Sequence, residues 1–317
     1  MTRRVLISGG AGFIGSHVAE AFLADGWDVT VVDDLSRGHR DNLPAGVTFA
    51  ELDVRSPEAR QLAAAGRFDV VSLQAAQIDV RHSVADPAFD ASINVMGLIN
   101  MVEGAAAGGT RRVVFASSGG VLYGEAETIP TAESAPQAPV SPYGVSKLAG
   151  EHYLRCLAGL RGMEWVALRY ANVFGPRQDP KGEAGVVSIF LDRLRGGQPL
   201  TVFGDGTQTR DYVFVRDVAR ANLLAATAAL PDGGGPDATA FNVGTGRELS
   251  VLDLIRIMGE SLNLRPEARH EPPRAGELAR SALDSTRAQQ LLGWRPVHSF
   301  EDGFRELVAW YDGEMNA

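Results

Sequence analysis

The sequence predicts an α/β fold, a doubly wound parallel sheet with a smaller, mixed α/β lobe in the C-terminal half. Two observations predict it. Through the first half of the chain, short apolar runs alternate with helical patterns, which indicates parallel strands with helices on both faces of a sheet. After about residue 172 this alternation ends, and loops, single helices and single strands follow.

Each predicted strand of the first half is a short apolar run. These strands span residues 3–8, 28–33, 47–53, 68–76, 111–118 and 163–175. Helical patterns fall over residues 13–25, about 86–107 and from 141 onward. Ligands of such sheets bind at the carboxyl ends of the strands, so the residues that follow each run are candidates for a site.

The second half predicts a smaller lobe over the ligand edge of the sheet. Helices are expected over 186–197, 216–230 and 249–262, and strands over 199–206 and 238–244. We expect residues 1–171 to form the sheet domain, with the chain returning to it at about 211–245. Residues 172–210 and 246–317 then form the smaller, substrate-binding lobe.

Composition limits the partners and the compartment. The 317 residues are 45% hydrophobic and 22% charged, as in a globular protein, and the formal net charge of −9 argues against nucleic acid and membrane as partners. The single cysteine, Cys156, fits a reducing cytoplasm and has no metal-type neighbours, so we expect no metal. The apolar run Val5 to Ile7 is too short for a secretory signal, and no stretch approaches a membrane span.

A glycine-rich turn follows the first predicted strand and opens a helix. Gly10, Gly12 and Gly15 fit the spacing G-x-G-x-x-G, and Gly9, Gly12 and Gly15 fit the variant G-x-x-G-x-x-G. Glycine is needed where the chain turns sharply and where backbone approaches a pyrophosphate, and the following helix points N–H groups at the phosphates. This context predicts a dinucleotide-binding domain of the Rossmann type, with a purely structural turn as the alternative.

An acidic residue at the end of the second strand favours NAD over NADP. Asp33 would accept hydrogen bonds from the adenosine ribose and repel a 2′-phosphate, although the nearby Arg37 leaves NADP open. Asp53, after the third strand, could meet the adenine amino group or be a simple turn residue. Ala75 and Ala76, after the fourth strand, would let backbone approach the cofactor, and plain packing is the alternative.

The stretch SPYGVSKLAGEHY predicts an acid–base centre. Tyr143 and Lys147 lie about one helical turn apart and share a face, behind Ser141 as an N-cap and Pro142 in the first turn. Tyrosine has a pKa of about 10, which a nearby ammonium lowers. The preceding strand ends at Ser118, whose hydroxyl can help pass a substrate proton. The predicted catalytic residues are therefore Tyr143, Lys147 and Ser118; ordinary helix surface is the alternative.

Stretches along nearly the whole chain resemble the extended short-chain dehydrogenase/reductase family, and within it the bacterial UDP-glucose (UDP-galactose) 4-epimerases. The matching stretches are GGAGFIGSH, VVDDLSRG, QAAQIDVRHSV, SSGGVLYGE, SPYGVSKLAGEHY, LRYANVFGPRQ, GEAGVV, VFGDGTQTRDYVFVRDVA and PPRAGE…LGWRP. Together they are specific for nucleotide-sugar enzymes and less specific for which one.

The resemblance implies a mechanism. Tyr143, helped by Ser118, removes the proton of the sugar 4-hydroxyl, and hydride passes from C4 to NAD+ and returns to the other face of the 4-keto sugar. Lys147 would hold the nicotinamide ribose and lower the pKa of Tyr143, and Asn94 would brace the active-site helix or be a buried structural amide. The implied cofactor-binding residues are Gly9, Gly12, Phe13, Ile14, Gly15, Asp33, Asp53, Val54, Ala75, Ala76, Gln77, Asn94, Tyr143, Lys147 and Tyr170.

A UDP-sugar site is implied as well. Arg210 and Arg274 would bind the diphosphate, because a guanidinium meets phosphate through two hydrogen bonds at once. The implied substrate-binding residues are Ser118, Asn172, Val186, Val187, Phe203, Arg210, Tyr212, Arg274 and Glu277. Ser281 is small where relatives that exclude N-acetylated sugars often carry a bulky aromatic, so it could leave room for an acetamido group.

Two departures from the family concern Gly119 and Gly120. Relatives often place the catalytic hydroxyl four residues before the tyrosine of V-Y-G, and counting back from Tyr123 reaches Gly119. We choose Ser118 instead, because the strand end fixes its hydroxyl, and interpret the glycine pair as a one-residue insertion. The related 4,6-dehydratases carry Asp-Glu here; two glycines offer no carboxyl group, which argues against elimination chemistry.

Other activities and an assembly remain as alternatives. A UDP-N-acetylhexosamine or UDP-glucuronate 4-epimerase is the second candidate, and a non-catalytic NAD-binding protein is the third. The resemblance suggests a homodimer that joins the helix around residues 94–107 and the helix of Tyr143, although packing within one chain fits the same residues.

Overall fold

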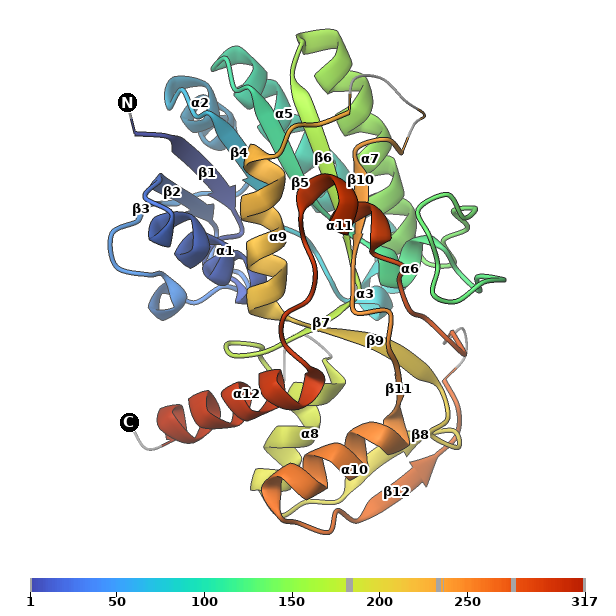
Figure 1. Cartoon of the computed structure of the whole chain (residues 1–317). Helices are drawn as coiled ribbons and strands as arrows, with labels where there is room; N and C mark the ends of the chain where they lie inside the picture. The colour runs from blue at the N-terminus through green and yellow to red at the C-terminus, as the bar shows by residue number, and fades with distance from the viewer. Residues whose placement is uncertain (1, 181–184, 232–234, 236, 275–277, 316–317) are drawn as a thin grey trace.

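The large sheet is parallel throughout and has seven strands in the order β10-β6-β5-β4-β1-β2-β3 (Figure 1). The computed structural model describes residues 2–180, 185–231, 235, 237–274 and 278–315. The strands are β1 (Arg4–Ser8), β2 (Asp28–Asp33), β3 (Thr48–Glu51), β4 (Val70–Leu73), β5 (Arg112–Ser118), β6 (Glu164–Tyr170) and β10 (Ala240–Val243). The order runs outward from β1 and β4 in both directions, so the predicted doubly wound α/β fold is confirmed.

Helices cover both faces of this sheet, and each face has its own apolar core. On one face lie α1 (Phe13–Ala24) and α9 (Val215–Thr227), which bury Phe22 and Val218. On the other lie α2 (Pro57–Ala65), α5 (Leu98–Ala107) and α7 (Pro142–Arg161), which bury Met101 and Leu154. Coverage of both faces explains why the strands are nearly continuous apolar runs.

A smaller group of elements lies beyond the carboxyl ends of these strands, in the lower part of Figure 1. One sheet has the order β11-β9-β7, and β8 pairs with β12. The bounds are β7 (Asn172–Phe174), β8 (Leu200–Phe203), β9 (Thr209–Phe214), β11 (Glu248–Ser250), β12 (Ala268–Glu271), α8 (Val186–Arg195), α10 (Val251–Leu262) and α12 (Phe300–Met315). A third core joins them, in which the Phe174 and Phe300 rings lie 4.9 Å apart. The chain runs from β9 directly into α9, and thus returns to the large sheet.

Several elements differ from the sequence-based expectation. The helix predicted over about 86–107 is divided into α4 (Pro87–Ala91), a π-helical segment (Ser92–Gly97) and α5, and a separate short helix that was not predicted, α3 (Val80–Ala85), precedes it. Pro87 has no N–H to continue a helix from α3, and Asp86 caps α4 by accepting from the Phe89 N–H at 2.9 Å. Helices α2, α11 (Thr286–Leu292) and α12 were not predicted, although Ser56 before Pro57 is a helix-start signal.

Two short helical segments complete the description: η1 (Arg40–Asn42) and α6 (Gly119–Leu122). The latter follows β5 directly and begins with the glycine pair noted in the sequence. Among the described ranges, every helix is too short or too polar to cross a membrane.

Candidate active site

The glycine turn between β1 and α1 packs against the loop that follows β4. Gly9 has a φ of +71°, and a Cβ there would lie 2.5 Å from the backbone nitrogen of Ala75. A Cβ on Gly15 would lie 2.0 Å from the carbonyl oxygen of Gly9. Both positions therefore exclude any side chain, and α1 begins at Phe13 with the N–H groups of its first turn available as donors.

Asp33, the last residue of β2, holds this turn in place. Its carboxylate accepts the backbone N–H of Ala11 at 3.0 Å and of Leu35 at 2.9 Å. Burial raises the pKa of Asp33, and the two hydrogen bonds oppose that shift. Asp53 does not bind the turn but forms an ion pair with Arg55 at 2.5 Å. The hydrogen bond from the Arg55 side chain lowers the pKa of Asp53.

A pocket opens at the carboxyl edge of the sheet beside the glycine turn. Its lining includes ten predicted cofactor residues: Gly9, Gly12, Phe13, Ile14, Gly15, Asp33, Asp53, Val54, Ala75 and Ala76. A cradle in which a Cβ would collide, a helix start and an acid at the end of β2 are the features that the phosphates and ribose of a dinucleotide require. The residues present therefore fit NAD.

Three further predicted cofactor residues, Gln77, Asn94 and Tyr170, are buried and do not line this pocket. The side-chain amides of Gln77 and Asn94 donate to the same oxygen of Asp90, at 2.9 Å and 3.0 Å. Asn94 also accepts the backbone N–H of Gln77 at 3.0 Å. The Tyr170 hydroxyl accepts a hydrogen bond from Asn222 at 2.7 Å. These side chains fix the loop after β4 and the end of β6.

Ser118, Tyr143 and Lys147 converge where β5 ends against α7. The Ser118 and Tyr143 side chains share a hydrogen bond. The Lys147 ammonium lies 5.8 Å from the centre of the Tyr143 ring and donates to the Ala116 carbonyl at 2.9 Å. Ser141 caps α7 as expected, by accepting the Gly144 N–H at 3.2 Å.

The electrostatics of this group differ from the expectation that Lys147 lowers the pKa of Tyr143. Burial raises the pKa of Tyr143 to about 12, the Ser118 hydrogen bond opposes that shift, and the Asp90 charge adds to it. Burial also lowers the pKa of Lys147 to about 8, against the charges of Asp90 and Glu151. For both groups, desolvation by burial is the largest cause of the shift in pKa.

The glycine pair after Ser118 occupies two different environments. A Cβ on Gly119 would lie 2.5 Å from the end of the Leu283 side chain, which would have to shift to admit a larger residue. A Cβ on Gly120 would lie 3.6 Å from the Asn172 side-chain oxygen, an ordinary contact. Neither position carries a group that could protonate a leaving hydroxyl.

A second pocket lies in the smaller part of the molecule. Its lining includes the predicted substrate residues Asn172, Val186, Val187, Phe203, Arg210, Tyr212 and Arg274. The Arg274 guanidinium stacks on Phe203, 3.7 Å from the ring centre. Glu277, also predicted here, lies outside the described residues. Ser281 donates its backbone N–H to the Thr209 carbonyl at 3.2 Å, next to Arg210.

The strand order relates the two pockets to the hydroxyl pair. Ala75 and Ala76 of the first pocket follow β4, and Asn172 of the second follows β6. Strand β5, which ends at Ser118, lies between β4 and β6 in the sheet. The strand that carries Ser118 thus lies between the strands that lead to the two pockets, while Ser118, Tyr143 and Lys147 themselves line neither pocket.

Comparisons with known proteins agree with this arrangement. The model of the NAD dependent epimerase/dehydratase family matches residues 5–244. The chain belongs to this family. A family relative, the UDP-glucose 4-epimerase of Mycolicibacterium smegmatis, is 43% identical over 313 residues, which cover 97% of this chain and 98% of the relative. The resemblance inferred from the sequence motifs is confirmed, and NAD is the cofactor of the family.

Two solved structures of UDP-glucose 4-epimerases are similar over almost the full chain. One, from Thermotoga maritima with UDP-glucose, has a TM-score of 0.93 and 40% identity, and the match covers 98% of this chain and 99% of that one. The other, from Thermus thermophilus with NAD, has a TM-score of 0.90 and 43% identity, again covering 98% and 99%.

The two pockets also contain residues that the sequence analysis did not assign to a site. In the first pocket they are Asp34, Ser36, Arg37, Gly38, Leu52, Gln74, Ile78 and Ile93. In the second they are Val173, Phe174, Gln178, Gly185, Ile189, Phe190, Arg193, Thr201, Gln208 and Val251. Most are neighbours of predicted residues, so extending each motif by a few positions would have found them. Ile93, in the π-helical segment, is next to the predicted Asn94.

Proposed function

We propose that this protein is an NAD-dependent UDP-glucose 4-epimerase, an isomerase that inverts C4 of the sugar. The observation that carries the proposal is the Ser118–Tyr143 hydrogen bond, with Lys147 one turn along the same helix, at the end of the strand that lies between the strands leading to the two pockets. When bound, NAD accepts a hydride from the sugar and gives it back. The protein itself must then bind and orient the sugar and move one proton.

The two hydroxyl groups carry out the proton transfer. Tyr143 is the base for the sugar 4-hydroxyl, and Ser118 relays or shares the proton through its hydrogen bond. Because burial holds the pKa of Tyr143 at about 12, the base needs further positive charge at the site before it can act near neutrality. We infer that Lys147 and the nicotinamide ring supply this charge together.

Specificity is assigned to the second pocket and the loop beside it. Arg210 and Arg274 are suited to the diphosphate, and Phe203 to the uracil ring once Arg274 leaves its face. Gly119 and Gly120 supply no acid, which favours epimerisation over dehydration. A UDP-N-acetylhexosamine or UDP-glucuronate substrate is the second candidate, and the small Ser281 favours the N-acetylated sugar.

We also propose a division into domains, an assembly and a cellular location. The division into an NAD-binding domain at 1–171 with a return at about 211–245, and a substrate lobe at 172–210 and 246–317, is supported by the separate cores of the two regions. A homodimer is supported by exposed apolar side chains on the proposed interface, namely Met96, Val145, Tyr153 and Leu160. A cytoplasmic location is supported by the single cysteine.

The test is to incubate purified protein with UDP-glucose, without added NAD, and to separate the products. Formation of UDP-galactose is expected, together with NAD that has co-purified. Net release of NADH would contradict the proposal, because an epimerase returns its hydride in every cycle. Parallel turnover of UDP-N-acetylgalactosamine tests Ser281: complete inactivity on that sugar would rule out the acetamido pocket.

A further inference from the structure

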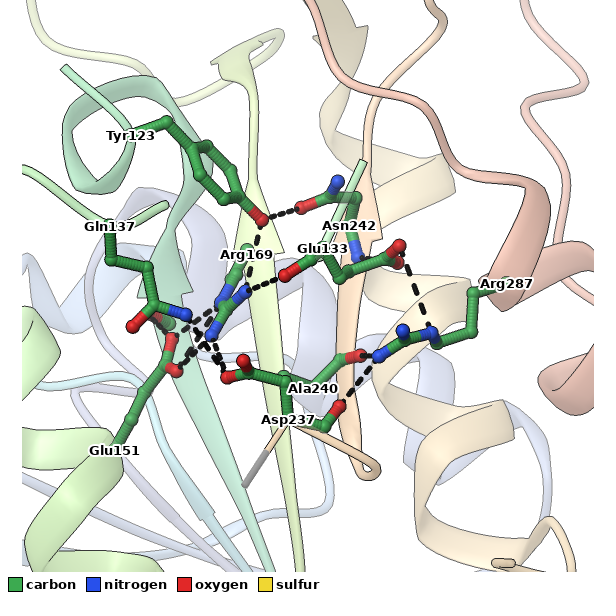
Figure 2. Close-up of polar contacts among 10 residues, drawn as sticks. Tyr123, Glu133, Gln137, Glu151, Arg169, Asp237, Ala240, Asn242 and Arg287 are labelled. Atoms are coloured by element: carbon green, nitrogen blue, oxygen red, sulfur yellow. Dashed lines mark hydrogen bonds and ion pairs between the residues drawn. The ribbon is translucent and has the colours of Figure 1, made fainter. Parts of the chain in front are cut away.

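Figure 2 shows a buried polar cluster around Arg169. Its labelled residues line neither pocket. At its centre is Arg169 of β6, which has no exposed surface. Its guanidinium donates to both carboxylate oxygens of Glu151, with the shortest contact at 2.7 Å, and to Asp237 at 2.6 Å. A fully buried arginine with two carboxylate partners is costly to assemble, so it calls for an explanation.

Glu151 joins this cluster to the strand that carries Ser118. It accepts the hydroxyl of Ser117 at 2.5 Å, and Ser117 is the register partner of Arg169 across β5 and β6. Glu151 lies one turn beyond Lys147 on α7, as Lys147 lies one turn beyond Tyr143. Helix α7 is therefore hydrogen-bonded to three consecutive residues of β5. Lys147 bonds to Ala116, Glu151 to Ser117 and Tyr143 to Ser118.

The cluster also holds the chain on the other side of Ser118. Arg169 donates to the Tyr123 hydroxyl at 3.0 Å, and Tyr123 donates in turn to Asn242 of β10 at 2.8 Å. Tyr123 follows α6, which begins immediately after Ser118. The residues before and after the reacting hydroxyl are thus both anchored to one guanidinium, as Figure 2 shows for Tyr123, Arg169 and Glu151.

We propose that Glu151 and Arg169 are positioning residues for the reaction. Through their hydrogen bonds to Ser117 and Tyr123, they hold the Ser118 hydroxyl against Tyr143. The inference rests on the proposed epimerase function and deepens it. Small displacements of a reacting group cost large factors in rate while substrate affinity stays the same. If the cluster contributed to folding alone, disturbing it would not lower kcat while leaving substrate affinity unchanged.

The charge of Glu151 has a second consequence. Lys147 faces the carboxylates of Asp90 on α4 and Glu151 on its own helix, together with the Tyr143 ring of α7 and the Phe115 ring of β5. Both carboxylates favour the ammonium form. Removal of the Glu151 charge, with Arg169 left in place, makes Lys147 lose its proton at lower pH.

Two variants test the inference. Ser117→Ala removes the hydroxyl link to Glu151 and leaves the ion pair intact, so it is the mild change. Glu151→Gln keeps the shape and removes the charge. The control is Glu164→Gln: Glu164 pairs at 2.8 Å with the buried Arg112, and these two residues are register partners at the opposite end of β5 and β6.

For Ser117→Ala we expect kcat for UDP-glucose to fall about tenfold or more, with KM and NAD affinity within about twofold of the unchanged protein. For Glu151→Gln the alkaline limb of the kcat profile moves to lower pH by about half a unit or more. The Tyr143 phenolate absorbance, read against Tyr143→Phe, appears at higher pH in Ser117→Ala, because the Ser118 hydrogen bond is weakened. Glu164→Gln leaves all of these unchanged and lowers only the unfolding temperature.

A kcat for Ser117→Ala within about twofold of the unchanged protein, in a stable and active enzyme, would overturn the inference. So would a Glu151→Gln profile that coincides with that of the Glu164→Gln control. If the unchanged protein fails to convert UDP-glucose, the proposed function fails instead. The phenolate titration still decides the positioning role in that case, and Ser117→Ala does so if Glu151→Gln does not fold.

Discussion

The side-chain hydroxyls of Ser118 and Tyr143 share a hydrogen bond, although one ends a strand and the other lies in the first turn of a helix far along the chain. This contact brings two proton-carrying groups to one point, at the end of the strand that lies between the strands leading to a pocket that fits NAD and a pocket lined by Arg210 and Arg274. Chemistry at that point is expected to depend on each of the groups that converge there.

Tyr143→Phe tests the base directly. The phenyl ring keeps the packing and removes the proton acceptor that Ser118 meets on α7, so we expect kcat to fall by about 10²- to 10⁴-fold. Conversion of UDP-glucose measures this, with NAD and UDP affinity as controls for intact pockets. Activity within tenfold of the unchanged protein would show that another group removes the proton.

The burial of Lys147 predicts a characteristic dependence of stability on pH. Its pKa is about 8 in the folded chain, below the ordinary value of 10.5. Between these two values the unfolded chain binds more protons, so this residue makes stability rise with pH across that window. Tyr143 acts in the opposite sense: its pKa is raised to about 12, so its contribution is complete below its ordinary value of 10.0 and is lost as pH rises through 12.

Lys147→Met isolates the first contribution. We expect the difference in unfolding free energy between the unchanged protein and Lys147→Met to change in favour of the unchanged protein as pH rises from about 8. Denaturant unfolding at a series of pH values measures it. A difference that stays constant across the window would mean that the ammonium is well solvated in the folded chain.

Substitution of Asp33 and, as a control, of Asp53 tests cofactor recognition. In Asp33→Asn one oxygen becomes an NH₂ that opposes the backbone N–H of Ala11 or Leu35, so the glycine turn loosens and the 2′-phosphate is repelled less. We expect NAD to bind about tenfold more weakly and the preference over NADP to shrink. Asp53→Asn should change NAD affinity by less than about threefold, because that carboxylate is engaged by Arg55 near the surface. Calorimetric titration of cofactor-free protein measures both; equal losses would contradict the role of Asp33.

Glycine positions provide a further test through packing alone. Gly15→Ala places a Cβ 2.0 Å from the Gly9 carbonyl oxygen, so we expect loss of bound NAD and a lower unfolding temperature. Gly159→Ala, in α7, meets nothing within 4 Å and should stabilise the protein by about 0.5–1 kcal/mol. Thermal unfolding and the absorbance of bound cofactor measure the pair. Normal NAD content in Gly15→Ala would show that the turn can shift to accept a side chain.

Much of the fold and part of the site follow from short-range patterns. Alternating apolar runs and helices predict the parallel sheet, the glycine turn between β1 and α1 predicts the dinucleotide pocket, and the Tyr143–Lys147 spacing places both side chains on one helix face. These features depend on periodicity and on local backbone geometry, so the sequence by itself determines them.

The tertiary structure decided the contacts that join distant segments. It placed Ser118 against Tyr143, interrupted the helix before α5 with a π-helical segment, bound Gln77 and Asn94 to Asp90, and buried Arg169 with Glu151 and Ser117. No local pattern encodes which buried charge meets which, because each partner is brought in by a different strand or helix. The raised pKa of Tyr143 follows for the same reason: desolvation is a property of the packed molecule and not of the residue.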